Sequence, residues 1–447
     1  MDYDVIMIGA GHATWHAAVT LKQQGKRVAI VEKDMVGGTC TNYGCDAKIA
    51  LDGPFQLKEQ LARFKGAGID EVPAINWPDL MAYKHQVIDP FSPAMTDMFT
   101  KMGIDMITGS AELTGDHEVT VAGKTYTSEY IVLGTGQRPA QLNIPGAENI
   151  HDSREFLDLP DMPERLVFIG AGIIAMEFAS MAASMGKAVH IVEFTDKALA
   201  PFNQTYVARL QQKLEAQGVQ FHFGEAVSAV TKNGAAFTVS TKSGLTIDTD
   251  YILGATGRVA NVEGLGLEKL GIEASRRGIK VNDHLQTAVA NIFASGDVID
   301  RPQAKLTPVA IFESNYIAAQ ILGQTAPIDY PAIPSVVFTM PRLSQVGVTA
   351  DAAADQPDAY RTQVLKFGQQ ATFELKRALD AEATLVFDKA GYLVGASVYA
   401  DDGEELINML TVIINGRYTA GMLQKQIFAF PSASSAMLDT LTALLPR

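Results

Sequence analysis

Residues 4–14 read DVIMIGAGHAT, an apolar run that ends in two glycines, Gly9 and Gly11, with Thr14 three positions further on. A second apolar run, VAIV, follows and ends at Glu32. Glycines after a strand let the chain turn tightly and approach a pyrophosphate, and an acid at the end of the next strand accepts hydrogen bonds from a ribose. The stretch therefore predicts a strand–turn–helix–strand unit that binds a dinucleotide.

The same plan occurs again in LVFIGAGIIA, residues 166–175. Gly170 and Gly172 take the glycine positions, and Glu193 follows the first glycine by 23 residues, as in the first copy. Both copies have a small residue where a third glycine is usual, and each is followed by an apolar strand that ends in Thr-Gly. These paired features are Thr14 and Ala175, and Thr135-Gly136 and Thr256-Gly257. Two such units predict two bound dinucleotides.

The last piece of the first unit is displaced to residues 291–297, after the second unit is complete. We therefore expect residues 1–146 and 266–328 to form one domain, with a second domain inserted at 147–265. Residues 329–447 have no glycine fingerprint and predict a third, α+β domain. Its expected elements are strands near 362–377, 382–388 and 391–399 and helices near 402–416 and 432–444. The expected fold class is α/β, with two Rossmann-like domains and this C-terminal domain.

Composition excludes several classes of protein. The chain has 447 residues, is 47% hydrophobic and carries a formal net charge of −14, which repels phosphate backbones and argues against a nucleic-acid partner. No uncharged apolar run reaches 18 residues, so we expect no membrane helix. The first residues leave no room for a signal peptide, and only two cysteines occur, Cys40 and Cys45. We expect a cytoplasmic protein.

The stretch GGTCTNYGC, residues 37–45, places both cysteines shortly after Glu32. With the two glycine fingerprints, the Thr-Gly strands and ASGD at 294–297, the chain resembles the flavoprotein disulfide reductases, the family of dihydrolipoamide dehydrogenase and glutathione reductase. The resemblance covers essentially the whole sequence. It implies bound FAD, a nicotinamide dinucleotide, a redox-active Cys40–Cys45 disulfide and a homodimer formed through the C-terminal domain.

The resemblance also implies roles for individual residues. Cys40 would be the interchange thiol, Cys45 the thiol beside the flavin, and Lys48 with Glu177 the ion pair next to the flavin. The implied FAD contacts are Gly9, Gly11, Thr14, Glu32, Gly38, Thr39, Ala111, Thr135, Gly136, Asp297 and Thr307. The implied nicotinamide dinucleotide contacts are Gly170, Gly172, Ile174, Glu193, Val227 and Gly257. We expect no metal ligands.

Two of these roles raise physical questions. In a regular helix, residues five apart lie about 8.6 Å from each other, too far for a disulfide, so the cysteine pair needs a distorted turn that Gly44 can supply. An acid at Glu193 repels a 2′-phosphate, so we expect NADH, although nearby Lys197 leaves NADPH as the alternative.

The sequence departs from the family near its C-terminus. Family members have a histidine followed by a glutamate that serve the interchange thiol as an acid–base pair, whereas this chain has Phe430 and Ser435 there. A proton donor accelerates such chemistry by roughly 10² to 10⁴. Tyr43, Tyr399 and Tyr418 are candidate replacements.

Three functions therefore remain open. The first is reduction of a small disulfide with a replacement acid. The second is reduction of a metal ion, a quinone or oxygen, and the third is a flavoprotein that senses oxidants. His12 and Trp15 are unusual beside a phosphate-binding loop, and we expect His12 to face solvent.

Overall fold

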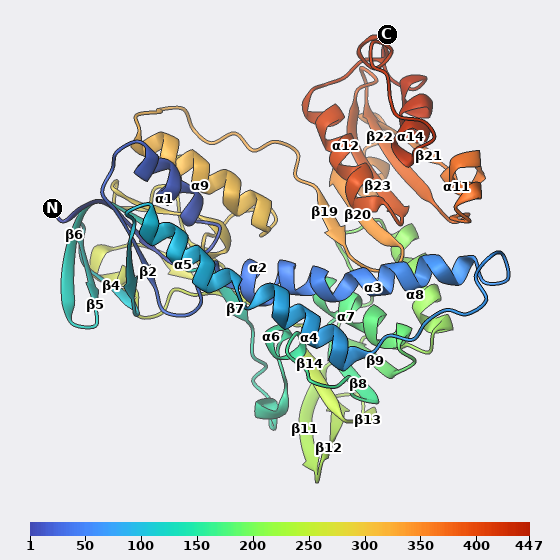
Figure 1. The fold of residues 1–447 in the computed structure, drawn as a ribbon, viewed down its shortest axis with the longest axis horizontal. Helices are drawn as coiled ribbons and strands as arrows, with labels where there is room; N and C mark the ends of the chain where they lie inside the picture. The colour runs from blue at the N-terminus through green and yellow to red at the C-terminus, as the bar shows by residue number, and fades with distance from the viewer.

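In the computed structural model, which describes all 447 residues, the first apolar run is the middle strand of a mostly parallel sheet (Figure 1). The strands are β1 (Tyr3–Ile8), β2 (Val28–Glu32), β3 (Asp105–Thr108), β4 (Ala111–Gly115), β5 (Glu118–Val121), β6 (Lys124–Leu133) and β18 (Ile292–Ala294). The order is β3-β2-β1-β6-β5-β4, and β18 also pairs with β6. Val5, Ile6 and Met7 are fully buried, as expected for a strand covered on both faces.

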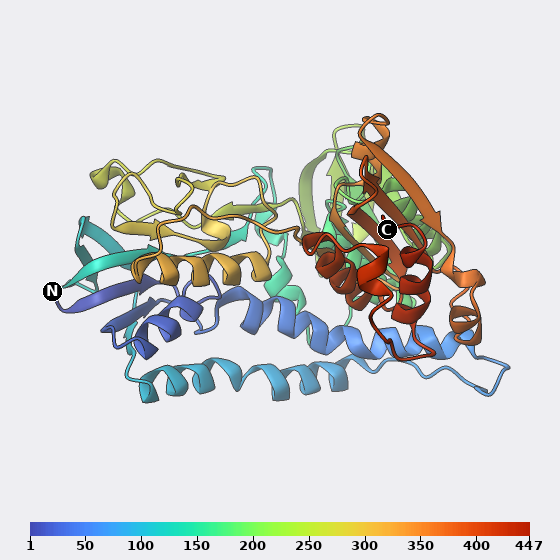
Figure 2. The ribbon, with the colours of Figure 1, turned by 90° about the horizontal axis from the view of Figure 1, so that it is seen from above.

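Helices surround this sheet and extend beyond it. They are α1 (Trp15–Gln23), α2 (Gly38–Tyr43), α3 (Cys45–Arg63), α4 (Trp77–Ile88), α5 (Phe91–Lys101) and α9 (Thr307–Ile321). α1 and α9 lie side by side, although they come from opposite ends of the domain (Figure 1). α3 is long and runs from the edge of the first domain to the C-terminal domain (Figure 2).

The second glycine fingerprint lies in a separate four-stranded parallel sheet of order β10-β9-β8-β14. These strands are β8 (Arg165–Ile169), β9 (Ala188–Glu193), β10 (Gln220–Phe223) and β14 (Tyr251–Gly254). The accompanying helices are α6 (Ser153–Phe156), α7 (Ile173–Ser184) and α8 (Gln204–Ala216). A three-stranded antiparallel sheet packs nearby through a small apolar core and consists of β11 (Val227–Asn233), β12 (Ala236–Thr241) and β13 (Thr246–Thr249).

β18 follows this second sheet in the chain but pairs in parallel with β6 of the first. Between the two sheets, the short strand β7 (Gln137–Pro139) pairs with β15 (Arg258–Ala260), and β16 (Ala274–Ser275) and β17 (Gly278–Ile279) form a short hairpin. The return of β18 supports the proposed division into 1–146 with 266–328, 147–265 and 329–447.

The C-terminal part is a five-stranded antiparallel sheet with helices packed against it. Its strands are β19 (Ser335–Val337), β20 (Arg342–Gly347), β21 (Tyr360–Leu365), β22 (Glu382–Asp388) and β23 (Leu393–Ala400). Its helices are α10 (Ala350–Ala354), α11 (Ala371–Leu375), α12 (Gly403–Asn415), α13 (Ala420–Leu423) and α14 (Ala433–Thr442). This mixture of layers confirms the expected fold class. No helix in the chain is both long and apolar enough to span a membrane.

One expected strand is wrong. The prediction of a strand over 362–377 holds only to Leu365, where β21 ends. Beyond it, Phe367 and Phe373 stack in the core with ring centroids 5.4 Å apart, and Gly368 packs against the backbone of Leu379. A turn followed by α11 therefore replaces the second half of the strand, because both aromatic rings must enter the same core.

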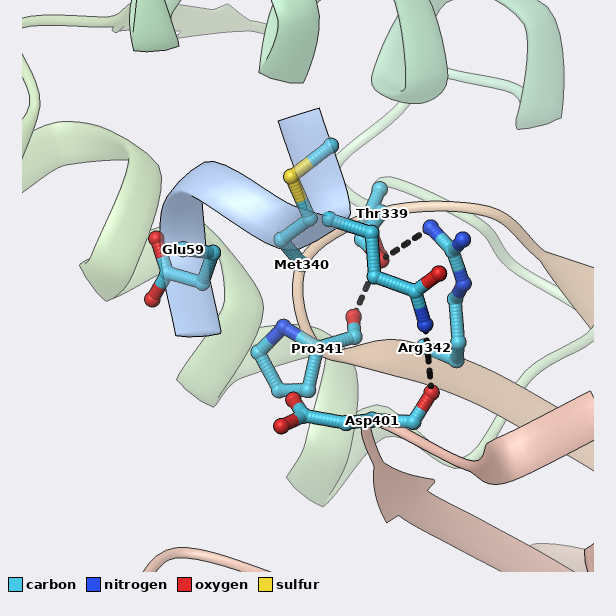
Figure 3. A pocket seen from close by; sticks show the side chains of 7 residues that line it. Glu59, Thr339, Met340, Pro341, Arg342 and Asp401 are labelled. Carbon is cyan, nitrogen blue, oxygen red and sulfur yellow. Dashed lines mark hydrogen bonds between the residues drawn. The ribbon is translucent and has the colours of Figure 1, made fainter. Parts of the chain in front are cut away.

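The C-terminal domain meets α3 at a small pocket, where Glu59 of α3 lies opposite Met340, Pro341 and Asp401 (Figure 3). Arg342 at the start of β20 forms a buried ion pair with Asp52 of α3, with Nη1 3.1 Å from Oδ1, and the same nitrogen donates to the carbonyl of Thr339. Further along α3, Arg63 pairs with Asp401 at 2.7 Å. The helix that begins at Cys45 is thus fixed to the C-terminal sheet by charge pairs.

Candidate active site

The first glycine loop is built around positions that exclude a side chain. Gly9 has φ of +103°, and a Cβ there would lie 2.5 Å from the carbonyl oxygen of Gly134. The Thr14 hydroxyl donates to the Gly9 carbonyl at 2.6 Å and closes the loop. A Cβ on Gly38 would in turn lie 3.0 Å from Cα of Gly11, so the cysteine segment packs directly on this loop.

The second loop repeats this geometry. Gly170 also has φ of +103°, and its missing Cβ would lie 2.6 Å from the carbonyl oxygen of Ala255. Gly172 caps α7, and Ile174 lies in the first turn of that helix. A dinucleotide phosphate at each helix N-terminus would meet backbone N–H groups without a side chain in the way.

Glu32 and Glu193 each accept a hydrogen bond from the glycine loop of their own domain, a contact that the sequence pattern does not predict. Glu32 accepts a hydrogen bond from the N–H of Ala10 at 2.8 Å, and Glu193 accepts one from Ala171 at 2.8 Å. Each carboxylate therefore holds a glycine loop in shape besides standing at the ribose end of its strand. The other oxygen of Glu193 accepts from the N–H of Thr195 at 2.8 Å.

Ala111 and Val227 occupy matching places beside these acids. The carbonyl of Glu32 accepts from the N–H of residue 109, two positions before Ala111, at 2.8 Å. The carbonyl of Glu193 accepts from the N–H of residue 225, two positions before Val227, at 3.0 Å. The structure thus brings both predicted residues to the end of a dinucleotide site that carries the acid.

The thiol segment is interrupted where the sequence predicts it. α2 ends at Tyr43 and α3 begins at Cys45, with Gly44 between them at φ −141° and ψ −115°. A Cβ on Gly44 would lie 2.7 Å from the carbonyl oxygen of Thr39, so glycine permits the close turn. Both cysteines are free thiols, Cys40 half-buried and Cys45 exposed.

The two thiols differ in their electrostatic surroundings. The pKa of Cys45 is lowered to about 6 by a hydrogen bond from Cys40, by the Thr307 hydroxyl 3.6 Å from its sulfur, and by the charge of Lys48. The same hydrogen bond, with burial, raises the pKa of Cys40. At neutral pH the pair therefore holds one thiolate, on Cys45, and one thiol, on Cys40.

Lys48 and Glu177 meet as expected from their proposed roles. Nζ of Lys48 lies 3.0 Å from a Glu177 carboxylate oxygen, and only 2% of the Glu177 side chain is exposed. Phe338 completes the group, because its N–H donates to Glu177 at 2.8 Å and its ring lies 4.1 Å from the Lys48 ammonium. Burial raises the pKa of Glu177, and the ammonium opposes this. No local signal marks Phe338 in the sequence.

Asp297 lies beside a cationic region. The Asp297 carboxylate accepts no hydrogen bond from the chain, and burial raises its pKa against the charges of three neighbouring cations. A cavity of about 430 Å³ lies where β7 and β15 join the domains, and Gly257 is among its lining residues. Its cationic side chains are Arg258, Arg276, Arg277, Arg301 and Lys305. The sequence does not predict this cluster, because its cations come from separate stretches of a chain whose net charge is negative.

The remaining predicted residues lie close to these loops. Thr135 donates to the carbonyl of Asn261 at 2.7 Å, and Gly136, with φ of +67°, accepts from the N–H of the same asparagine. Thr39 lies in the first turn of α2. No group of three or more potential metal-binding side chains occurs in the chain.

Of the candidate replacement acids, Tyr43 has a hydrogen-bond partner, Tyr399 is buried, and Tyr418 packs against the core of the C-terminal domain. Tyr43 donates to Asp34 at 3.1 Å, and its pKa is raised to about 12 by burial and the nearby carboxylate. Tyr399 is buried in the domain joint. Phe430 is 82% exposed in the loop before α14. Ser435, at the glutamate position, forms a capping box with Ser432 at the start of that helix.

The residues present fit the two dinucleotides. The glycine loops leave room that a Cβ would fill, and Asp297 offers a carboxylate with no donor from the chain. Residues 3–314 match the family model of pyridine nucleotide-disulphide oxidoreductases, and residues 333–441 match the dimerisation domain of the same family.

The chain is similar in sequence to known proteins over most of its length. The chain is 30% identical to a dihydrolipoyl dehydrogenase of Bacillus subtilis, with 98% of both chains covered. It is 32% identical to a glutathione reductase of Pisum sativum over 79% of this chain and 67% of that one.

The HOCl-induced flavoprotein disulfide reductase RclA from Escherichia coli, 27% identical, superposes with a TM-score of 0.89 over 99% of this chain and all of that one. RclA has also been solved as a Cu(II) complex. This chain is thus an oxidoreductase that binds FAD and a pyridine nucleotide, and its dimerisation domain indicates a homodimer. The chain belongs to the pyridine nucleotide-disulphide oxidoreductase family.

Proposed function

We propose that this protein oxidises NADH through FAD and the Cys40–Cys45 pair and passes the electrons to an acceptor that needs no proton donor from the protein. The observation that carries the proposal is the position of Cys45, whose sulfur lies 3.6 Å from the Thr307 hydroxyl at the N-terminus of α9. The partial positive charge of that N-terminus favours an anion beside it. Cys45 is thus a stabilised thiolate in a position to exchange electrons.

FAD, when bound, supplies acceptance of a hydride from NADH and delivery of two electrons to the thiol pair. Gly9, Gly11 and Asp297 would hold it, and Lys48 would place a positive charge beside it. Leaving the buried Glu177 carboxylate unpaired would cost free energy. The ion pair is therefore maintained, and Glu177 keeps the Lys48 ammonium in position. When the dithiol is oxidised, the sulfur–sulfur bond forms, two electrons leave for the acceptor and the thiol proton of Cys40 leaves to solvent.

The preference for NADH is supported by Glu193. Its carboxylate is buried at the end of β9 and already accepts hydrogen bonds from the loop and from Thr195. A 2′-phosphate brought to the same ribose would meet a fixed negative charge. We therefore expect kcat/KM for NADH to exceed that for NADPH, and Glu193→Ala to reduce the difference.

The nature of the acceptor is supported by the C-terminal loop. Phe430 is an exposed hydrocarbon in place of a histidine, and Ser435 is engaged in capping α14. When a substrate disulfide is reduced, a proton donor stabilises the thiolate that leaves. A metal ion or a quinone accepts electrons without protonation of a sulfur atom. A small disulfide is the second candidate, because the two thiols are kept in the arrangement that disulfide exchange requires.

The test is an anaerobic NADH titration of the holoprotein, followed by visible absorbance. A long-wavelength thiolate–flavin band that appears with the first equivalent of NADH, and is absent in Cys45→Ser, supports a working thiol pair. Bleaching of the flavin by one equivalent without that band would refute it. Steady-state assays with metal ions, quinones and small disulfides then identify the acceptor, and Phe430→His/Ser435→Glu should raise disulfide turnover selectively.

A further inference from the structure

Phe338, which lies between β19 and β20, contacts both members of the Lys48–Glu177 ion pair. Its N–H donates to the Glu177 carboxylate at 2.8 Å, and the centre of its ring lies 4.1 Å from the Lys48 ammonium. Lys48 comes from α3 and Glu177 from α7, so three distant segments of the chain meet at one positive charge. Phe338 itself lies within the stretch that matches the dimerisation domain. The C-terminal domain therefore reaches the ion pair through Phe338.

A second ion pair lies against the same ring. The guanidinium carbon of Arg342 is 5.2 Å from the ring centre, and Nη1 of Arg342 is 3.1 Å from Oδ1 of Asp52. No more than 3% of either side chain is exposed. Lys48 and Asp52 are four residues apart on α3, as Phe338 and Arg342 are on the segment that faces it. The ring thus contacts two cations, each of which has its own carboxylate, so what it adds for the ammonium is a direction rather than a counter-charge.

The ring restrains the ammonium in a way that the carboxylate does not. The Glu177 carboxylate attracts Lys48 through both of its oxygens, at 3.1 and 3.0 Å from Nζ, whereas an aromatic ring attracts a cation over its face. The Lys48 side chain is 16% exposed, so water screens the contact weakly. At such a site a cation–π contact favours the contacting position by about five- to thirtyfold. Loss of the ring would free the ammonium while leaving the backbone hydrogen bond to Glu177 in place.

The place of this ammonium matters for the thiols. The pKa of Cys45 is lowered by hydrogen bonds from Cys40 and Thr307 and by the charge of Lys48. A Coulomb interaction weakens with distance, so an ammonium that moves away stabilises the thiolate less. The same charge would favour a reduced, anionic flavin at the proposed FAD site. Both effects depend on where Nζ of Lys48 is held.

We propose that Phe338 is a positioning residue, whose ring holds the Lys48 ammonium where it acts on the Cys45 thiolate and on the bound flavin. The flavin part of this proposal rests on the proposed function, which places Lys48 beside FAD. The thiolate part rests on contacts within the chain alone. The C-terminal domain thereby takes part in setting the electrostatics of electron transfer, besides its role in dimerisation.

The test is a double-mutant cycle between Phe338 and Lys48 in the holoprotein. Phe338→Leu should raise the pH midpoint of iodoacetamide alkylation at Cys45, by less than Lys48→Met does. It should also lower the midpoint potential of the flavin by up to about 30 mV, which is a tenfold change for a two-electron couple. Neither quantity should change when Phe338→Leu is added to Lys48→Met, because no ammonium is then left to position. Phe338→Met, which fills similar space without a ring, serves the same purpose if the leucine variant does not fold.

Phe338→Tyr keeps the ring and should retain the wild-type values of both quantities. The matched control is Phe387→Leu, which removes another ring that lies over a cation, Arg361 at 4.0 Å, and should lower thermal stability without changing either midpoint. The proposal is overturned if Phe338→Leu and Phe338→Met leave both midpoints at the wild-type values, or if they shift them equally in the wild-type and Lys48→Met backgrounds. A missing thiolate–flavin band in the NADH titration would refute the proposed function, while the Cys45 midpoints would still test the role of Phe338.

Discussion

Replacing Thr307 with valine removes one specific stabiliser of the Cys45 thiolate. The pKa of Cys45 is held at about 6 by Cys40, by the Thr307 hydroxyl at 3.6 Å and by Lys48. A hydrogen bond to a charged group contributes about 1.5–3 kcal/mol, and one pKa unit corresponds to about 1.4 kcal/mol. Because Cys45 is exposed and partly screened by water, the lower end of this energy range applies. We expect Thr307→Val to raise the pKa of Cys45 from about 6 to about 7.

The assay is alkylation of the reduced protein by iodoacetamide as a function of pH, with the modified cysteine identified by mass spectrometry. Only the thiolate reacts, so the midpoint of the rate profile reports the pKa of Cys45. The midpoint should move from about 6 to about 7. The plateau above pH 8 should rise about two- to threefold, because a more basic thiolate is the better nucleophile.

Thr307→Ser is the matched control, since it keeps the hydroxyl and loses only a methyl group. Its midpoint should stay with the wild type. The reasoning is refuted if the valine and serine variants have the same midpoint, whether both stay at the wild-type value or both move. In the first case the hydroxyl does not stabilise the thiolate, and in the second the methyl group is what matters.

Three further perturbations test the surroundings of the thiols. Lys48→Met should raise the midpoint of the same alkylation profile, by less than Thr307→Val, because the lysine charge also lowers the pKa of Cys45. Gly44→Ala should lower the free energy of unfolding by about 1–3 kcal/mol, since its Cβ would lie 2.7 Å from a carbonyl oxygen. Gly421→Ala in α13, whose Cβ would meet nothing closer than 3.9 Å, should instead stabilise by up to about 1 kcal/mol in urea unfolding. Asp52→Ala should cost about 3 kcal/mol, because the buried Arg342 loses its closest carboxylate and keeps only Glu404 at 3.7 Å and the Thr339 carbonyl. Asp4→Ala, which breaks an exposed pair, should cost at most about 1 kcal/mol.

Much of the fold follows from local sequence signals. The glycines at Gly9 and Gly170 adopt the same φ and approach the carbonyl of the residue before a Thr-Gly pair in each domain, so one motif predicts the same loop twice. The break at Gly44 is likewise predictable, because disulfide geometry excludes a continuous helix. These features depend on residues close together in the chain, where steric rules act directly.

The features that sequence reasoning missed join distant segments. Phe338 reaches Glu177 through a backbone N–H, and Arg301 and Lys305 join the cationic cavity only after the domains assemble. No residue spacing or periodicity in the sequence predicts such contacts. The expectation that His12 faces solvent is wrong, because its Nδ1 lies 3.1 Å from Nε2 of His16. The hydrogen bond between His12 and His16 also joins different local structures, because His12 lies in the loop before α1, which begins at Trp15.

The two sides of the thiol pair support different conclusions about chemistry. On the dinucleotide side, the buried Lys48–Glu177 pair is retained, although an apolar pair would serve stability equally well. Phe430, at the position of the family's histidine, offers no proton, and Asp46, directly after Cys45, raises the pKa of both thiols by its charge. This buried ion pair supports the proposed role of Lys48 and Glu177 beside the flavin, where electrons would enter the thiol pair. The hydrocarbon at the histidine position and the carboxylate next to Cys45 both favour the proposed acceptor that gains electrons without a proton, and a positively charged acceptor would be attracted by that carboxylate.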